Sequence, residues 1–407
     1  MDNFDVCIIG GGPAGIMAAG AARAKYEKVL LLEKNKQLGK KLFITGKGRC
    51  NITNSVPIED FFDNIVSNKQ FLYSSLYTFT NDSVIELLNK YGLNTKVERG
   101  NRVFPETDKS SDVLKAFQKY LKEMQVEIRL NSNVNHIKYT GEDFSVYLNE
   151  DMVINCKKLI IATGGKSYTA TGSTGDGYNF AKSLGHTITD LKPSLVPMEL
   201  SNEWVGDLMG LSLKNVLLKA YKGEKLQHEE FGEMIFTHYG ISGPIVLTMS
   251  NYVNRIKSKL HLYLDLKPAL TNEILDARIL RDFEKYNNKV LKNSLNDLLP
   301  QKLIPLVIKY SGMDPFIVVN QISKLQREQL LDSIKNFKLD FSGFRPLEEA
   351  IVTSGGISVK EINPSTMESK LIPGLYFAGE IIDVDGLTGG FNLQIAYSTG
   401  YLAGISV

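Results

Sequence analysis

The sequence contains few cysteines, no long apolar run and almost no net charge, and each absence excludes a class of protein. Its 407 residues include only Cys7, Cys50 and Cys156, which are too few for a disulfide framework. No apolar run approaches the ~18 residues of a membrane span, and the acidic start does not resemble a secretory signal. The formal charge of +2 gives no general reason to expect a nucleic-acid or membrane partner. We therefore expect a cytoplasmic, multidomain protein with no nucleic-acid partner and no membrane partner.

Glycine, in contrast, is abundant, and its placement near the N-terminus predicts a nucleotide-binding unit. Residues 4–9 are typical of a buried parallel strand, residues 14–25 predict a helix, and residues 29–32 predict a second strand. Between the first strand and the helix lies the pattern G-x-G-x-x-G, formed by Gly10, Gly12 and Gly15. Gly10 permits the tight turn, Gly12 lets the backbone approach a diphosphate, and Gly15 lets the helix pack closely on the strand.

An acidic residue at the end of the second strand identifies the nucleotide. Glu33 lies where a carboxylate accepts hydrogen bonds from an adenosine ribose, and it would repel a 2′-phosphate. The bound nucleotide is therefore FAD or NAD rather than NADP.

The segment that follows is rich in cations and contains no acid. Residues 34–49 carry six cations, which on a solvated face need no ligand. The same segment contains Gly39, Gly46 and Gly48, and glycines combined with cations suit a loop that lies along a diphosphate. We expect part of this segment to contact the cofactor and the rest to be solvated; the candidates are Lys34, Lys40 or Lys41, Arg49 and Asn51.

The remaining sequence predicts a discontinuous first domain with an insertion. Residues 159–161 predict a buried strand that runs into Thr163 and Gly164, and residues 127–137 alternate like a single strand. Near the C-terminus, a strand at residues 375–380 precedes Gly389-Gly390 and a helix at residues 395–403, whose N-terminus can bind the polar edge of a flavin ring. Between them, strands and then helices indicate an inserted domain. We place the FAD-binding domain at residues 1–190 and 345–407, and the insertion at 191–344 with its helical part around 271–336.

Several motifs together resemble a known family. The chain resembles the bacterial FAD-dependent flavoproteins related to aminoacetone oxidase and to the bile-acid 3-dehydro-4,6-steroid reductase. The motifs are GGGPAG (10–15), GKKLFITGKGRCNITN (39–54), ATGGKSYTATGSTGDGY (162–178), FTHYGISGP (236–244), TSGGI (353–357) and GLYFAGEIIDVDGLTGGFNLQIAYSTG (374–400).

The resemblance implies an α/β fold in which a Rossmann-like, two-dinucleotide-binding domain holds FAD noncovalently beneath an inserted β plus helical domain. It implies that Gly12, Ala14 and Glu33 hold the adenosine diphosphate and that Val134 contacts the adenine. It also implies that the ribityl and flavin portion is approached by Lys41, Gly46, Arg49, Cys50 and Asn51, and that the cofactor is lined by Thr163, Gly164, Gly379, Asp383, Gly390, Asn392 and Leu393.

Three candidates could take part in the chemistry, and each also has a structural interpretation. His238 could transfer a proton beside the flavin or could fix the insertion by hydrogen bonds. Tyr168, with Thr174 and Asp176, could face the substrate or could form a turn network. Cys50 could be a redox thiol activated by nearby cations, or a small residue packed near the flavin. The other histidines are isolated, and no spacing indicates a metal site.

The sequence therefore predicts an FAD-dependent oxidoreductase acting on a small organic or steroid-like substrate, with flavin N5 carrying the hydride. Reductase and oxidase both remain open. NADH or NADPH could supply electrons, although no second nucleotide-binding unit is present to hold either one. A flavin-containing redox sensor or partner-binding protein is the alternative. Flavin-dependent tRNA modification is disfavoured by the near-neutral charge and the lack of a recognisable RNA-binding module. The oligomeric state is not predicted.

Overall fold

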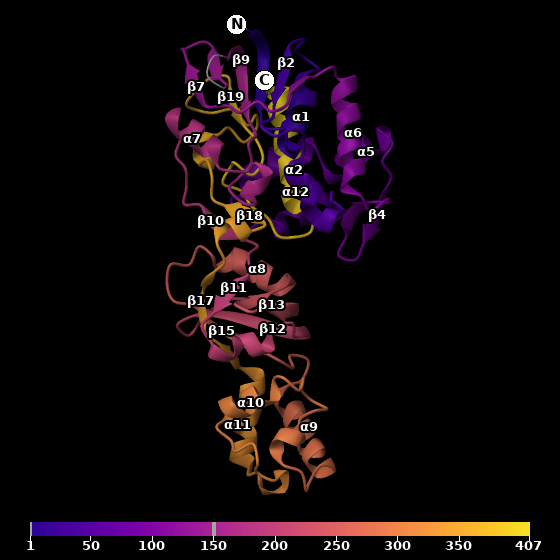
Figure 1. Ribbon diagram of the computed structural model, residues 1–407, viewed down its shortest axis with the longest axis vertical. Helices are drawn as coiled ribbons and strands as arrows, with labels where there is room; N and C mark the ends of the chain where they lie inside the picture. The colour runs from indigo at the N-terminus through magenta and orange to yellow at the C-terminus, as the bar shows by residue number, and fades with distance from the viewer. Residues whose placement is uncertain (1, 149–151) are drawn as a thin grey trace. The chain divides into compact units, whose positions relative to one another are not determined.

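The computed structural model describes residues 2–148 and 152–407, which form two compact units (Figure 1). The first unit combines the chain up to Ser194 with Leu347–Val407, and the second is the intervening segment Leu195–Pro346. The sequence had suggested boundaries after residues 190 and 344. Each unit has its own core of buried apolar side chains.

The first unit is built on a seven-stranded sheet in which the predicted strands lie side by side. Strand β1 (Asp2–Ile9) lies between β2 (Val29–Leu32) and β9 (Val153–Ile161), parallel to both. Parallel strands β6 (Glu127–Arg129) and β19 (Leu375–Phe377) pair with β2 and β9, respectively. The antiparallel strands β8 (Phe144–Tyr147) and β7 (His136–Tyr139) complete the sheet. The C-terminal part of the chain therefore completes a sheet begun by its first residues, as the sequence predicted for the fold class.

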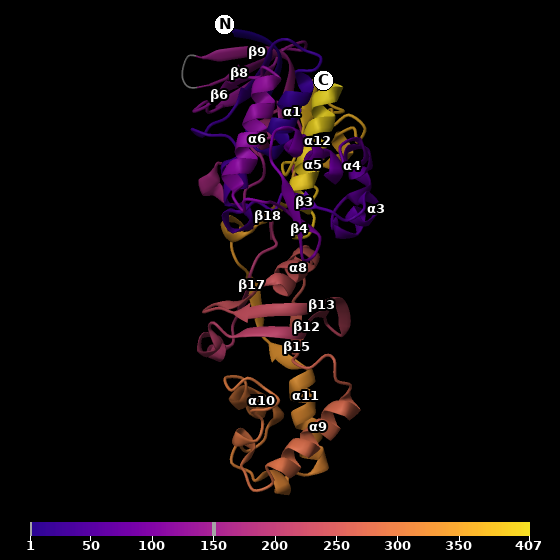
Figure 2. The ribbon, with the colours of Figure 1, turned by 90° about the vertical axis from the view of Figure 1, so that its right-hand side faces the viewer.

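Helices α1 (Pro13–Ala22) and α12 (Phe391–Ser406) lie side by side in both views (Figures 1 and 2). Small residues make this contact close. A Cβ atom on Gly400 would lie 2.2 Å from the carbonyl oxygen of Ala14, and one on Gly404 would lie 2.4 Å from that of Ala18. The close contact places the first turn of α1 beside the middle of α12, and Gly379 also approaches Ala14 there.

The rest of the first unit consists of short elements around this centre. A small antiparallel sheet has the order β3-β5-β4. Its strands are β3 (Thr53–Asn54), β4 (Thr95–Glu98) and β5 (Arg102–Pro105), and the helices are α2 (Lys40–Ile44), α3 (Ile58–Phe61), α4 (Tyr73–Thr78), α5 (Asn81–Lys90), α6 (Ser110–Glu123) and α7 (Asp176–Ser183). Strands β10 (Lys192–Ser194) and β18 (Val352–Ser354) pair antiparallel where the chain leaves and re-enters the unit.

The second unit combines a seven-stranded sheet, in the order β16-β15-β12-β13-β14-β11-β17, with four helices. Helix α8 (Pro244–Val253) packs on β12 and β13, whereas α9 (Asn272–Lys285), α10 (Ile304–Ser311) and α11 (Lys324–Lys335) pack together. The strands are β11 (Met198–Leu200), β12 (Ser212–Lys222), β13 (Lys225–Phe236), β14 (Gly240–Ser242), β15 (His261–Asp265), β16 (Phe337–Leu339) and β17 (Phe341–Phe344). The sequence spacing of Ser323 and Gln326 fits a capping box, and the two residues do bond reciprocally at the start of α11.

One sequence-based expectation was wrong, and two elements were missed. Residues 127–137 form two strands, β6 and β7, because Asn131 takes a left-handed conformation with φ 55° and interrupts the run. Strand β13 was missed because only Met234 and Phe236 of its twelve residues are buried and its charged face hides the alternation. Helix α7, which begins after Gly175, was also not predicted. No helix within the described part of the chain has the length and apolar character needed to span a bilayer.

Candidate functional site

The glycine turn between β1 and α1 leaves open space at the N-terminus of the helix. Gly10 has φ 107°, and a Cβ atom there would lie 2.5 Å from the carbonyl oxygen of Ala162 on the adjacent segment. A Cβ on Gly15 would collide with the backbone of Gly10. A Cβ on Gly12, however, would meet no atom within 4 Å, and no side chain caps the helix at this residue. The first turn of α1 can therefore direct its amide donors at an anion that approaches Gly12.

Glu33 lies directly beside this turn. Its Oε2 atom accepts a hydrogen bond from the amide of Gly11 at 2.8 Å, and its Oε1 accepts from the backbone and side-chain nitrogens of Asn35 at 2.8 and 2.7 Å. The amide of Ser132 donates to the Glu33 carbonyl, which brings the segment containing buried Val134 to the same place. The proposed adenosine-binding residues thus lie together, and Glu33 has the additional task of holding the turn.

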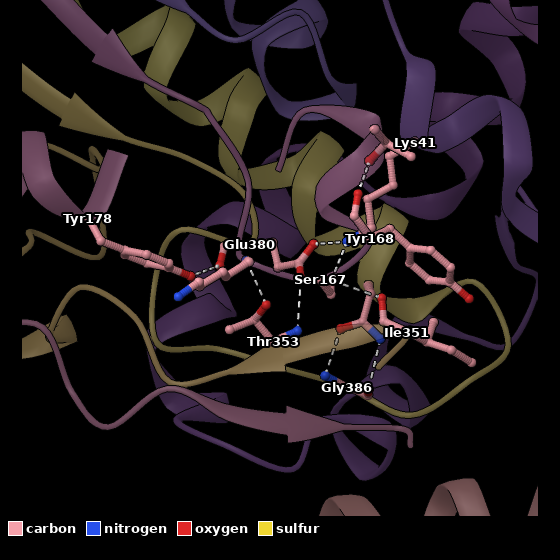
Figure 3. Close-up of polar contacts among 11 residues, drawn as sticks. Lys41, Ser167, Tyr168, Tyr178, Ile351, Thr353, Glu380 and Gly386 are labelled. Carbon is pink, nitrogen blue, oxygen red and sulfur yellow. Dashed lines mark hydrogen bonds and ion pairs between the residues drawn. The ribbon is translucent and has the colours of Figure 1, made fainter. Parts of the chain in front are cut away.

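A cluster of polar contacts joins four segments of the first unit (Figure 3). The Lys41 ammonium lies 2.7 Å from Glu380 Oε2 and donates to Ser167 Oγ at 2.7 Å. Ser167 in turn donates to Glu380 Oε1 at 3.0 Å, and the amide of Thr353 donates to the same oxygen at 2.9 Å. Figure 3 shows these side chains pointing toward one another from α2, the segment after β9, β18 and the loop after β19. Glu380 is the common acceptor that holds the segments together.

The C-terminal motif supplies the second helix end at the site. Gly379 has φ 81°, and a Cβ atom there would lie 2.8 Å from Cβ of Ala14. Gly390 begins α12 with φ 103° and no side-chain cap. Asn392 accepts from the amide of Gly386 at 2.9 Å and donates to its carbonyl at 2.8 Å, so it fixes the preceding loop. Asp383 is buried, and Leu393 packs partly buried against the core.

The loop between α2 and β3 is strained and partly buried. Gly46, Lys47 and Gly48 all have positive φ, as does the buried Cys50 at φ 62°. Desolvation raises the pKa of the Cys50 thiol to about 12, although a hydrogen bond with Thr45 opposes the shift. This neutral thiol favours the packing role of Cys50 over the redox role. The Arg49 side chain points toward β4 and β5, where it pairs with Glu98 at 2.7 Å and lies 3.9 Å from the centre of the Phe104 ring.

Two buried oxygens in the site have no hydrogen-bond partner among the described residues, namely Asn51 Oδ1 and Thr163 Oγ1. Such atoms are costly to bury unless a partner approaches them. Together with the open space at Gly12 and the two uncapped helix N-termini, they fit a dinucleotide whose diphosphate and polar ring edge supply the missing partners. The residues present are therefore suited to FAD.

A family model described as the HI0933-like protein Rossmann domain matches residues 4–406. The chain belongs to this family. It is 31% identical over 402 residues to a 3-dehydro-bile acid delta(4,6)-reductase from Clostridium scindens, covering 98% of this chain and 97% of the relative. It is 30% identical over 404 residues to a ribosomal RNA dihydrouridine synthase from Escherichia coli and 31% identical over 406 residues to one from Haemophilus influenzae. Each of these matches covers 98% of this chain and 97% of the relative.

Solved structures of low identity share the fold. A 3-ketosteroid delta1-dehydrogenase from Sterolibacterium denitrificans gives a TM-score of 0.53 at 12% identity, covering 99% of both chains. A 3-ketosteroid-delta4-(5alpha)-dehydrogenase from Rhodococcus jostii gives 0.51 at 15%, covering 100% of this chain and 96% of that one. This member of the HI0933-like family is an FAD-dependent oxidoreductase.

The other candidate site residues from the sequence analysis lie in three separate parts of the structure. Tyr168 directly follows Ser167 of the polar cluster. It has φ 51° and is 37% exposed. Lys34 pairs with Asp176 at 2.7 Å and donates to Thr174, which favours the turn network for those two residues. His238 belongs to the second unit, where it is exposed between β13 and β14.

Sequence reasoning missed Glu380, Ser167 and Thr353. Glu380 could have been noticed, because it follows a buried strand and a glycine, much as Glu33 follows β2. Ser167 and Thr353 carry no such signal, since each is a short polar residue in a segment that contains several.

Proposed function

We propose that the protein is a reductase that saturates a carbon–carbon double bond next to a carbonyl group. The observation that carries the proposal is the nearly full-length similarity to relatives with two different names. Both names describe the same change: a delta(4,6)-reductase acts on double bonds of a 3-oxo compound, and dihydrouridine is uridine whose ring double bond has been reduced. The proposal therefore rests on the reaction that the two names share and not on either substrate.

The proposed reaction adds two electrons and two protons, equivalent to two hydrogen atoms, across the double bond. One carbon receives a hydride and its neighbour receives a proton, while NADH or NADPH is oxidised to NAD⁺ or NADP⁺. FAD supplies the hydride carrier at its N5 atom when it is bound. We propose that the nicotinamide binds transiently, because the sequence contains only one dinucleotide-binding unit.

The chain's own residues would bind and orient the cofactor. Amides at Gly12 and Ala14 would face the diphosphate, and Glu33 would accept from the ribose hydroxyls. Asn51 and Thr163 would bond the ribityl or ring portion through their unpaired oxygens. The N-terminus of α12 would stabilise negative charge that develops at the polar edge of the ring, an effect worth about 0.3–1 kcal/mol at an exposed helix end.

A proton donor must also reach the second carbon. Tyr168 is our candidate, because it directly follows Ser167, which belongs to the cluster with Lys41 and Glu380, and its side chain is partly exposed. His238 is the alternative donor, since its exposed ring lies in a glycine-rich loop of the second unit. Proton transfer by a positioned side chain contributes ~10²–10⁴-fold to a rate.

Two substrate classes are compatible with this chemistry. A small organic or steroid-like unsaturated ketone is supported by the relative from Clostridium scindens. A uridine within RNA is supported by the relatives from Escherichia coli and Haemophilus influenzae. The alternative function is that of a flavin-containing redox sensor, which would have no dedicated substrate.

The experiment follows the flavin spectrum under nitrogen. The purified protein is reduced with NADPH or NADH and then mixed with an unsaturated ketone, a uridine-containing RNA or oxygen. Reduction followed by fast reoxidation with the ketone or with a uridine-containing RNA, and slow reoxidation with oxygen, supports the reductase. Fast reoxidation by oxygen with peroxide formation indicates an oxidase instead. Failure of every donor to reduce the flavin favours the sensor.

A further inference from the structure

Two segments of the first unit carry cations and no acidic residue. Residues 34–49 contain five lysines and one arginine, and residues 163–175 contain one lysine, but neither contains Asp or Glu. This local composition differs from that of the whole chain, in which 47 Lys and Arg are nearly balanced by 45 Asp and Glu.

Hydrogen bonds join the two segments in the folded chain. Lys40 donates to the carbonyl of Ala170 at 2.8 Å, the side chain of Asn35 donates to the carbonyl of Thr171 at 3.1 Å, and Lys41 donates to Ser167 Oγ at 2.7 Å. These contacts join residues 35–41 to residues 167–171, so the start of α2 lies against the segment that carries Lys166 and Tyr168.

Only some of these cations are neutralised. Lys34 pairs with Asp176, Lys41 with Glu380 and Arg49 with Glu98. The other four make no ion pair with any described residue, and all are exposed; they are Lys36, Lys40, Lys47 and Lys166. The FAD diphosphate does not account for them, because the space for it lies at Gly12 on the N-terminus of α1.

Exposed rings accompany the cations. Phe43 is 42% exposed and Tyr168 is 37% exposed, each within the same acid-free segments. Unpaired cations beside exposed rings are the arrangement that binds single-stranded nucleic acid, because cations contact phosphates while rings stack on bases. A bile acid offers one carboxylate, which four separate cations do not require.

We propose that this basic rim, formed by Lys36, Lys40, Phe43, Lys47, Lys166 and Tyr168, binds single-stranded or looped RNA. The cations would hold the phosphate backbone, and the rings would stack on splayed bases, so that a uridine can enter the flavin site. The identity of the reduced base rests on the proposed function, but binding by the rim does not.

The test measures binding of a fluorescently labelled, uridine-rich, single-stranded RNA by anisotropy at several salt concentrations. The FAD-loaded protein carries K36E, K47E and K166E together, and the matched control carries K122E, K157E and K182E, which reverse three exposed lysines elsewhere on the same unit. Each phosphate contact on a single strand contributes ~0.7 to the magnitude of the slope of log affinity against log salt. We therefore expect the magnitude of this slope to fall by about 2 for the rim variant and to stay unchanged for the control. Phe43→Ala should weaken binding roughly tenfold with an unchanged slope.

Equal RNA binding by the rim variant and the native protein, or no salt-dependent binding by the native protein, overturns the proposal. So does loss of FAD from the rim variant, which would assign the cations to the cofactor. Weakened binding of a bile acid, rather than of RNA, would assign the rim to a small carboxylate and would also overturn it. Failure of the reductase function is separately visible, because it abolishes flavin reoxidation by substrate while RNA binding persists.

Discussion

At the scale of single residues, the site depends on acids that follow buried strands. Glu33 follows β2 and was predicted from its spacing to the glycines, whereas Glu380 follows β19 and was not. The difference has a physical cause. The partners of Glu380 lie 339, 213 and 27 residues away in sequence, on Lys41, Ser167 and Thr353, and only the folded chain brings them together.

Glu33→Arg should weaken FAD binding, because it removes acceptors for the ribose and also the anchor of the Gly11 amide. Loss of a charged hydrogen bond costs about 1.5–3 kcal/mol, or roughly tenfold to more than a hundredfold in affinity. FAD retention after dilution measures the effect, with exposed Glu27→Arg as the control. Equal retention in both variants would remove Glu33 from the ribose site.

Cys50 should be unreactive in the folded protein. Its thiol is buried and its pKa is raised to about 12, so alkylation by iodoacetamide at pH 8 should modify it only after unfolding. The unfolded thiol loses its proton near pH 9, whereas the folded thiol keeps it to about 12. The free energy of unfolding should therefore fall as pH rises through this window, and less steeply in Cys50→Ala. Rapid alkylation of the native protein, located by peptide mass mapping, would restore the redox role.

The two candidate proton donors can be separated by substitution. Tyr168→Phe should lower kcat by ~10²–10⁴-fold with FAD content unchanged, because the hydroxyl is removed and the ring is kept. His238→Ala should lower it far less if its role is structural. Measurement of kcat across a pH series distinguishes them, and the reverse ranking would transfer the proton donor to the second unit.

At the scale of elements, the sequence predicts those helices and strands that are determined by residues close together in the chain. The β1–α1–β2 unit is set by apolar runs and glycines, and the start of α11 by a capping box. Strand β13 was not predictable, because it is stabilised by pairing with β12 and β14 while only two of its twelve residues are buried. Helix α7 was hidden because its N-cap is Gly175 in a left-handed conformation, without a side-chain cap.

Ser323→Ala tests the element whose signal was clearest. The Ser323 hydroxyl oxygen accepts from the amide of Gln326 at 3.3 Å at the start of α11. Its loss should lower the free energy of unfolding by about 1 kcal/mol. Urea denaturation followed by circular dichroism measures the change, and Ser258→Ala at an exposed position serves as the control. Equal midpoints for the two variants would show that the cap adds nothing to stability.

At the scale of the whole molecule, balanced net charge concealed a local imbalance. The sequence-based argument against an RNA partner used the total charge of +2, whereas the folded chain brings two acid-free segments together. The two units, in contrast, had a counterpart in the sequence analysis, which expected an insertion within the first domain. Each has a separate core, and the pairing of β10 with β18 closes the first unit where the second is attached.

Replacing residues 195–346 with a short Gly/Ser linker should therefore leave a flavin-binding unit that has lost substrate turnover. Ser194 pairs with Val352, so the ends to be joined are already close to a paired strand. Flavin absorbance per protein and turnover measure the two properties separately. Loss of FAD from a folded, soluble product would show that the second unit contributes to cofactor binding.

The central claim, reduction of a conjugated double bond, is tested most directly by the mass of the product. The FAD-loaded protein is incubated without oxygen with NADPH or NADH and either a 3-oxo-4,6-diene bile acid or an unmodified ribosomal RNA transcript. The account predicts that one of these substrates gains two hydrogens, detected in the steroid or in a uridine of the digested RNA. Recovery of both substrates unchanged, with NADPH consumed only after oxygen is admitted, would contradict it.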